Sequence, residues 1–177
     1  MKLLLHTCCV PCLIGTLPLV EDFEVTCFWF NPNIHPYTEY KSRLDALELY
    51  ARDSNINLIV KDNYGLREFT QGVINKLEDK CGVCYNWRLR ECAELAGRNN
   101  FDAFSTSLLI SLYQKHEKIK ELGEKNGHEY NIKFFYGDFR PNFRSGQKIA
   151  RENNIYMQKY CGCIFSEEER YLQLRKK

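Results

Sequence analysis

Short apolar runs alternate along the chain with longer segments in which apolar residues recur every three to four positions. The short runs have the length and flanking residues of buried strands, and they predict strands over residues 2–6, 23–30, 56–60, 101–105 and 133–136. The longer segments, bounded by Pro, Gly or Asn, predict helices over residues 38–53, 84–98, 114–125 and 146–153. This alternation indicates an α/β fold with a mainly parallel sheet covered by helices.

The strand order suggests where a site would form. In open sheets of this kind ligands bind outside the carboxyl ends of the strands, and Cys8 and Cys9 come directly after the first strand. The same reasoning brings the loops 31–36, 105–113 and 138–140 to that edge. We therefore expect one compact site.

Composition narrows the class of protein. With 177 residues, 44% of them hydrophobic, the chain can bury one sizeable core, so we expect a single domain over residues 1–177, ending in a charged helix over 167–177. A net charge of +2 neither requires nor excludes a nucleic-acid partner. The apolar start is interrupted by His6, Pro11 and Pro18, and no apolar run has the length of a membrane span. We expect a soluble, cytoplasmic protein with no membrane partner.

Nine cysteines are more than a domain of this size needs for its core. Cys27 lies in an apolar run and Cys92 in a predicted helix, so both are interpreted as core residues. The other seven are clustered, which suggests ligands rather than packing. They form three groups: Cys8, Cys9 and Cys12; Cys81 and Cys84; Cys161 and Cys163.

The C-x-x-C pair of Cys81 and Cys84 lies near a predicted helix start, where two side chains three positions apart share a face. Alone, the pair is compatible with half of a zinc site, a redox dithiol or a cluster site. If a turn aims Cys8 and Cys9 at the same centre, four soft thiolates result. Such a set suits either structural zinc or a 4Fe-4S cluster.

Cys161 and Cys163 flank Gly162, a spacing that allows a disulfide only if the glycine bends the backbone. A disulfide in so small a ring would be easily reduced, which favours a catalytic or electron-relay pair. The alternative is two further metal ligands. Cys12 either belongs to a second metal site or faces the substrate.

Six segments together resemble the cobalamin-independent epoxyqueuosine reductases over nearly the whole chain: HTCCVPC, NPNIHPYTEYKSR, CGVCYNWRLR, FDAFSTSLLISLYQ, GDFR and YCGCIFSEEER. The resemblance implies a Rossmann-like, three-layer fold and the reduction of epoxyqueuosine to queuosine at the wobble position of tRNA. The single departure from the family pattern is Val10, where glycine is expected.

The resemblance also implies roles for individual residues. A 4Fe-4S cluster would be held by Cys8, Cys9, Cys81 and Cys84. Cys161 and Cys163 would form the redox-active pair, and a second, mononuclear iron is assigned to Cys12 and Asp138. An external electron donor, which the sequence does not identify, would restore the pair.

Epoxide removal requires two electrons and two protons, and the protons could come from Asp138, Tyr113 or water. An ordinary hydrogen-bonding loop residue is the preferred interpretation of Tyr113. Candidate contacts to the substrate are Arg43, Tyr113 and Arg140, the arginines belonging to a basic rim that includes Arg88. A solvated helix face is the alternative for this rim.

Two other functions remain open from the sequence. An ATP-dependent tRNA sulfur-transfer enzyme would share the sheet and the cysteines, but the loop HTCCVPC contains no glycine-rich phosphate cradle. A zinc-stabilised RNA-binding module would use four cysteines for structure alone and would leave the C-x-C pair unexplained.

Overall fold

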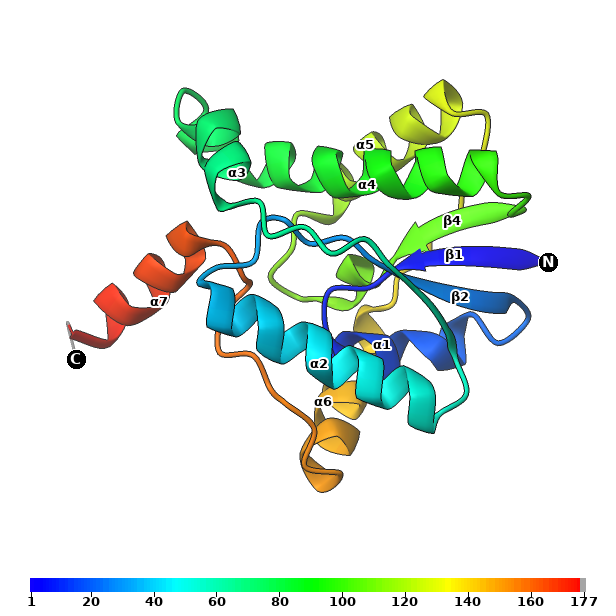
Figure 1. The fold of residues 1–177 in the computed structure, drawn as a ribbon, viewed down its shortest axis with the longest axis horizontal. Coiled ribbons are helices and arrows are strands. Elements are labelled where there is room, and N and C mark those ends of the chain that lie inside the picture. Colours follow the sequence, from blue (N-terminus) through cyan, green and yellow to red (C-terminus); the bar gives the residue numbers. More distant parts are fainter. Residues whose placement is uncertain (176–177) are drawn as a thin grey trace.

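The computed structural model describes residues 1–175 and contains one five-stranded sheet in which every neighbouring pair of strands is parallel (Figure 1). The strand order is β3-β2-β1-β4-β5. The strands are β1 (Lys2–His6), β2 (Glu24–Trp29), β3 (Asn57–Val60), β4 (Ala103–Thr106) and β5 (Lys133–Phe134). The predicted parallel sheet is therefore confirmed.

Helices cover both faces of this sheet, which confirms the three-layer α/β fold (Figure 1). One buried cluster joins β1 and β4 to α4 and α5, and a second joins β1 and β2 to α1, α2 and α6. The helices are α1 (Val10–Thr16), α2 (Tyr37–Asp53), α3 (Leu66–Val73), α4 (Lys80–Arg98), α5 (His116–Glu129), α6 (Phe143–Glu152) and α7 (Ile164–Arg175).

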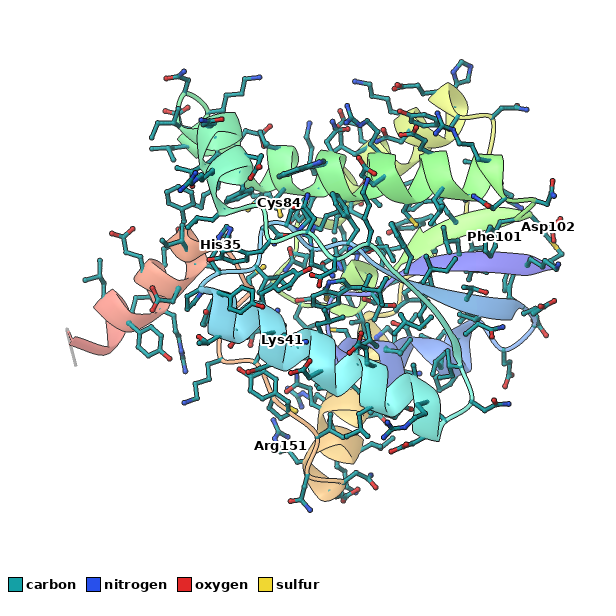
Figure 2. All side chains as sticks on the ribbon, in the orientation of Figure 1. His35, Lys41, Cys84, Phe101, Asp102 and Arg151 are labelled. Carbon is teal, nitrogen blue, oxygen red and sulfur yellow. The ribbon has the colours of Figure 1, made fainter. Side chains whose placement is uncertain are left out.

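The central strand β1 explains how the cysteines reach one edge. Leu3, Leu4 and Leu5 are fully buried, as expected for a parallel strand covered on both faces. Strand β1 pairs with β2 on one side and β4 on the other, so all three carboxyl ends meet at one edge. In Figure 2, Cys84 and His35 lie toward this edge, whereas Phe101 and Asp102 lie at the opposite end of the sheet.

Most predicted elements are present with shifted ends. Strand β1 matches its predicted range, and α2 and α6 begin one and three residues earlier than expected. Helix α4 begins four residues earlier, at Lys80, and α5 runs two residues later at its start and four at its end. Helix α7 begins at Ile164, three residues before the predicted charged helix, whose last two residues lie outside the described part of the chain.

Helices α1 and α3 were not predicted. Every residue of α1 is buried, so its sequence VPCLIGT lacks the polar face that marks an amphipathic helix. Helix α3 has only eight residues, and a glycine lies within it. Among residues 1–175, no helix combines the length and apolar character needed to cross a membrane.

Helices α1 and α6 pack closely because glycines face each other at their contact. A Cβ atom at Gly146 would lie 2.5 Å from the Pro11 carbonyl oxygen and 2.8 Å from the Gly15 nitrogen. We expect Gly146→Ala to lower the free energy of unfolding by about 1–3 kcal/mol, because both obstructing atoms belong to backbone. Chemical denaturation with urea measures the change.

Gly72→Ala in α3 is the matched control. The new Cβ would meet only Val83 Cγ1, at 3.7 Å, which is an ordinary contact. Alanine should therefore raise the free energy of unfolding by up to about 1 kcal/mol. Equal stabilities for the two variants would contradict the tight α1–α6 contact.

Candidate redox centre

Three thiols gather where β1 leads into α1. The Sγ atoms of Cys8, Cys9 and Cys12 all lie within 4.8 Å of one another, and all three residues are buried. Cys9 is the N-cap of α1 in an extended conformation, and Pro11 occupies the first turn. The chain therefore turns sharply after the strand and directs all three side chains to one point.

This environment favours one thiolate. Hydrogen bonds from Cys12 and Cys9, reinforced by the positive charge of Arg88, hold the pKa of Cys8 well below its usual value despite burial. The pKa of Cys12 is raised well above its usual value by its hydrogen bonds to Cys8 and Cys9 and by burial. Cys8 is thus the most readily ionised member of the triad.

The C-x-x-C pair lies in the first turns of α4. Cys84 is buried, and Arg88 follows it by one helical turn on the same face. Arg88 Nη2 donates a hydrogen bond to Cys84 Sγ at 3.1 Å, and Nη1 donates to Asn31 Oδ1 at 3.5 Å. Cys81 is half-buried and packs against the buried cluster that contains Cys8, Cys9 and Cys12, whereas Cys84 belongs to a separate cluster with Phe69.

Arg88 is only 2% exposed. Among residues 1–175, no carboxylate oxygen lies within 4.0 Å of its guanidinium. Burial disfavours its charge, but Cys84, Cys161 and Cys8 favour that charge when their thiols are ionised, and the pKa of Arg88 is raised. One member from each of the three cysteine groups therefore lies within electrostatic reach of this buried cation, and Cys84 accepts a hydrogen bond from it.

His6 supports the site without joining it. Its Nδ1 lies 2.8 Å from Thr106 Oγ1, and its Nε2 lies 3.2 Å from both Asn31 Oδ1 and the Phe30 carbonyl oxygen. Burial, together with the nearby charge of Arg88, lowers the pKa of His6 to about 4. His6 is therefore a buried, hydrogen-bonded histidine at the end of β1.

The C-terminal segment brings the C-x-C pair to the same edge. Cys163 is buried in a cluster with Cys84 and Phe69, whereas Cys161 is exposed and its Sγ accepts a hydrogen bond from Gln114 Nε2 at 3.1 Å. Gly162 between them has a φ of +144°, which L side chains rarely adopt. All nine cysteines, including this pair, are free thiols.

Arg43 holds this segment in place. It is 1% exposed, pairs with Glu39 at 2.6 Å, and donates to the carbonyl oxygens of Cys161 at 2.9 Å and Tyr160 at 3.0 Å. Arg43 and Arg88 were expected on a basic surface rim, and this expectation was wrong for both because they are buried. The expected contact between Arg43 and the substrate stays a prediction.

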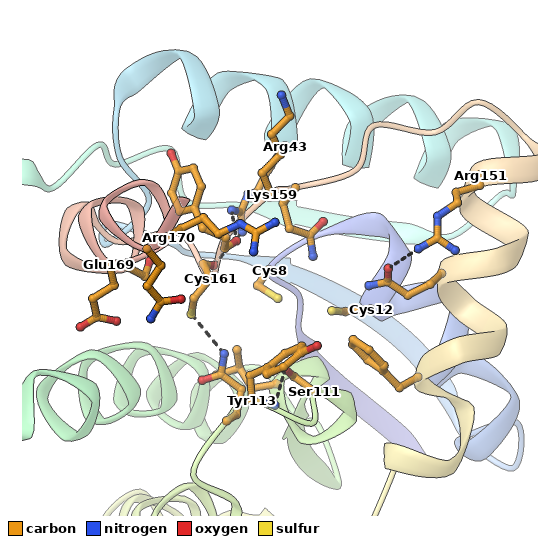
Figure 3. A pocket seen from close by; sticks show the side chains of 18 residues that line it. Cys8, Cys12, Arg43, Ser111, Tyr113, Arg151, Lys159, Cys161, Glu169 and Arg170 are labelled. Atoms are coloured by element: carbon orange, nitrogen blue, oxygen red, sulfur yellow. Dashed lines mark hydrogen bonds between the residues drawn. The ribbon is translucent and has the colours of Figure 1, made fainter. Parts of the chain in front are cut away.

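A cavity of about 560 Å³ opens over the cysteines (Figure 3). Cys8, Cys12 and Cys161 line it, and Tyr113 lines it from the loop after β4. Gln158 also lines the cavity and donates from Nε2 to Cys9 Sγ at 2.9 Å. The other end of its side-chain amide, Oε1, is buried and has no hydrogen-bond partner among the described residues. The volume suits a ligand of nucleoside size.

Asp138 and Arg140 are exposed, and neither lines this cavity. Arg140 donates through Nε and Nη2 to the two carboxylate oxygens of Asp138, at 2.7 Å each, and these bonds lower the pKa of Asp138 to about 2. Asp138 is not among the metal-ligating side chains that cluster in residues 1–175. Its assignments as iron ligand and proton donor, and that of Arg140 as a substrate contact, stay predictions.

Sequence reasoning missed several contacts to sulfur. Arg88 could have been found, because it lies four residues after Cys84 on one predicted helix. Gln114 and Gln158 carry no such signal, since each reaches its cysteine from a distant part of the chain. The core positions predicted for Cys27 and Cys92 are confirmed.

Comparison with known proteins places the chain among relatives of one kind. The model of the family described as epoxyqueuosine reductase QueH matches residues 3–169. The chain is similar to proteins named epoxyqueuosine reductase QueH from three bacteria. Identity is 34% to the Dehalococcoides mccartyi protein (96% of this chain, 94% of that one), 32% to the Thermotoga maritima protein (94% and 91%) and 34% to the Acinetobacter baylyi protein (93% and 80%).

Proposed function

This chain belongs to the epoxyqueuosine reductase QueH family, and from that premise we propose that it reduces epoxyqueuosine in tRNA to queuosine at a thiolate-bound redox centre. The wobble nucleoside is the proposed target. The enzyme is an oxidoreductase, and its reaction consumes electrons. Among ordinary side chains, thiols are the ones that can supply them.

The observation that supports a metal centre most directly is the buried cation Arg88. A buried guanidinium without a carboxylate partner is costly unless another anion balances it. Its hydrogen-bond acceptors are Cys84 Sγ, the Cys84 carbonyl oxygen and Asn31 Oδ1, and the groups near enough to balance its charge when ionised are the thiols of Cys84, Cys161 and Cys8. Thiolates become stable anions when they ligate a soft metal, so this donor set fits a cysteine-ligated iron site.

We assign Cys8, Cys9, Cys81 and Cys84 as the ligands of a 4Fe-4S cluster, with Cys12 and Asp138 as ligands of a second iron. Such centres supply single electrons and a Lewis acid for the epoxide oxygen. The close approach of Cys8, Cys9 and Cys12 supports metal binding by this triad. Asp138 would have to leave its ion pair with Arg140 to become a ligand.

The stoichiometry of the reaction states how many electrons and protons the site must provide. Two carbon–oxygen bonds break, a carbon–carbon double bond forms, and the oxygen leaves as water after taking two protons and two electrons. Oxidation of the Cys161 and Cys163 thiols to one disulfide releases the same two protons and two electrons. The two thiols therefore balance one turnover, and an external reductant must restore them.

The position of this pair supports the relay. Cys161 lines the cavity, and Cys163 lies in the cluster that contains Cys84. Cys161→Ser and Cys163→Ser should each abolish multiple turnover on tRNA that contains epoxyqueuosine, measured by nucleoside analysis after digestion. Cys27→Ala, in the core away from the cavity, should keep turning over. Full multiple turnover by both serine variants would refute the relay.

The metal is tested on anaerobically purified, reconstituted protein. We expect iron and acid-labile sulfide in comparable amounts and a brown chromophore that dithionite bleaches. Stoichiometric zinc without iron would instead support a zinc-stabilised RNA-binding module and would contradict reduction at this centre. ATP binding would support sulfur transfer.

A further inference from the structure

Three basic side chains line the cavity from consecutive parts of the C-terminal half. They are Arg151 from α6, Lys159 from the segment before the C-x-C pair, and Arg170 from α7 (Figure 3). All three residues are exposed. The same cavity is lined by Cys8, Cys12 and Cys161.

These cations are not neutralised within the described chain. No carboxylate in residues 1–175 lies within 4.0 Å of any of them. The acidic side chain that lines the cavity, Glu169, pairs with Lys80 at 2.8 Å. The fourth basic residue of the lining, Arg43, already pairs with Glu39. The mouth therefore carries local positive charge despite the modest net charge of the whole chain.

An aromatic surface completes the cavity. Tyr113 is 83% exposed, and its ring lies edge-on to Phe143, with centroids 6.0 Å apart and planes at 79°. Both residues line the cavity. An exposed aromatic ring beside unpaired cations is the combination that binds single-stranded nucleic acid, because bases stack on the ring while cations bind phosphates.

We propose that Arg151, Lys159 and Arg170 form a phosphate clamp that binds the RNA strand carrying the target nucleoside, with Tyr113 as the stacking surface. The clamp rests on the proposed function, since it assumes that the nucleoside enters this cavity as part of RNA. A cavity of about 560 Å³ admits one nucleoside, so the flanking phosphates must lie at the mouth, where the three cations are.

Binding without chemistry tests the clamp. The probe is a fluorescently labelled RNA stem-loop with an unmodified guanosine in its loop, followed by anisotropy across a series of salt concentrations. Each lost phosphate contact on a single strand lowers the magnitude of the slope of log K against log salt by about 0.7. Replacing all three cations by glutamine should therefore lower the magnitude of this slope by about 2. Tyr113→Ala should weaken binding about 5- to 150-fold, which is the equivalent of about 1–3 kcal/mol for one stacked base. Because tyrosine carries no charge, this variant should change the slope little.

Arg98→Gln is the control for the loss of one positive charge outside the cavity. It removes the same charge from the far end of α4, about 21 Å along the helix axis from Cys84, where Arg98 pairs with Glu94. Its salt slope should equal that of the unchanged protein. Thermal unfolding verifies that each variant is folded.

The two proposals fail separately. A wild-type salt slope in the folded triple variant would refute the clamp, even if the protein reduces epoxyqueuosine. A reduced salt slope in the triple variant confirms the clamp. If the unchanged protein then binds the stem-loop but leaves epoxyqueuosine unreduced, the proposed reductase function is wrong and the clamp stands.

Discussion

Cys84→Ser is expected to abolish the iron–sulfur chromophore and to lower the rate of epoxyqueuosine reduction by more than about 100-fold. Residues that only orient metal ligands already cost about 10- to 100-fold when mutated, and the loss of a ligand should exceed that. Serine nearly preserves the volume of the side chain but is a poor ligand for iron in a sulfur-ligated cluster. Iron content, the visible spectrum and turnover measure the result.

Cys92→Ser provides a control on the same helix. Cys92 is fully buried, two turns after the buried Cys84, but its Sγ faces the carbonyl oxygens of Leu4 at 3.8 Å and Ser105 at 4.0 Å. Burying a hydroxyl there should cost about 1–3 kcal/mol of stability and leave iron content unchanged. If Cys84→Ser kept its full chromophore, the assignment of Cys84 as a ligand would be wrong, whatever happened in Cys92→Ser.

The sheet could be predicted because its strands have a local signature. Continuous apolar runs such as Leu3 to Leu5 are typical of strands that are buried on both faces. Strand β1 indeed lies inside the sheet, where it is hydrogen-bonded to β2 on one side and to β4 on the other. Helix α1 could not be predicted, because burial on all sides removes the periodic pattern that identifies a helix. Its existence depends on tertiary contacts with α6, which sequence spacing does not record.

The candidate site divides in the same way. The grouped cysteines are visible in the sequence because each group is local, and of the predicted cluster ligands in residues 1–175 the structure gathers the Sγ atoms of Cys8 and Cys9 with that of Cys12, without Cys81 or Cys84. The interactions that modify them are long-range, such as Gln158 with Cys9 and Arg43 with the Cys161 carbonyl oxygen. Whether an arginine binds RNA or is buried as a structural cation depends on which face of its helix meets the core, and for Arg43 and Arg88 composition gave no indication.

Arg88→Met should weaken the metal centre while sparing the apoprotein. In the apoprotein Cys8 can take up a proton when the cation is removed, so the variant no longer buries a charge and should be as stable as the unchanged protein or up to about 4 kcal/mol more stable. A reduced cluster carries more negative charge than an oxidised one, and loss of the nearby cation should therefore lower its reduction potential. We expect faster loss of iron and a more negative midpoint in a redox titration.

Arg43→Met separates this effect from a general loss of buried charge. Removing Arg43 leaves the Glu39 carboxylate without its ion-pair partner and frees the carbonyl oxygens of Tyr160 and Cys161, so the variant should lose about 3–5 kcal/mol of stability with or without metal. Arg88→Met should instead show opposite shifts in apoprotein stability and in iron retention. A parallel loss of both in Arg88→Met would mean that Arg88 stabilises the fold through its hydrogen bonds to Cys84 and Asn31, and that its charge does not serve the metal centre.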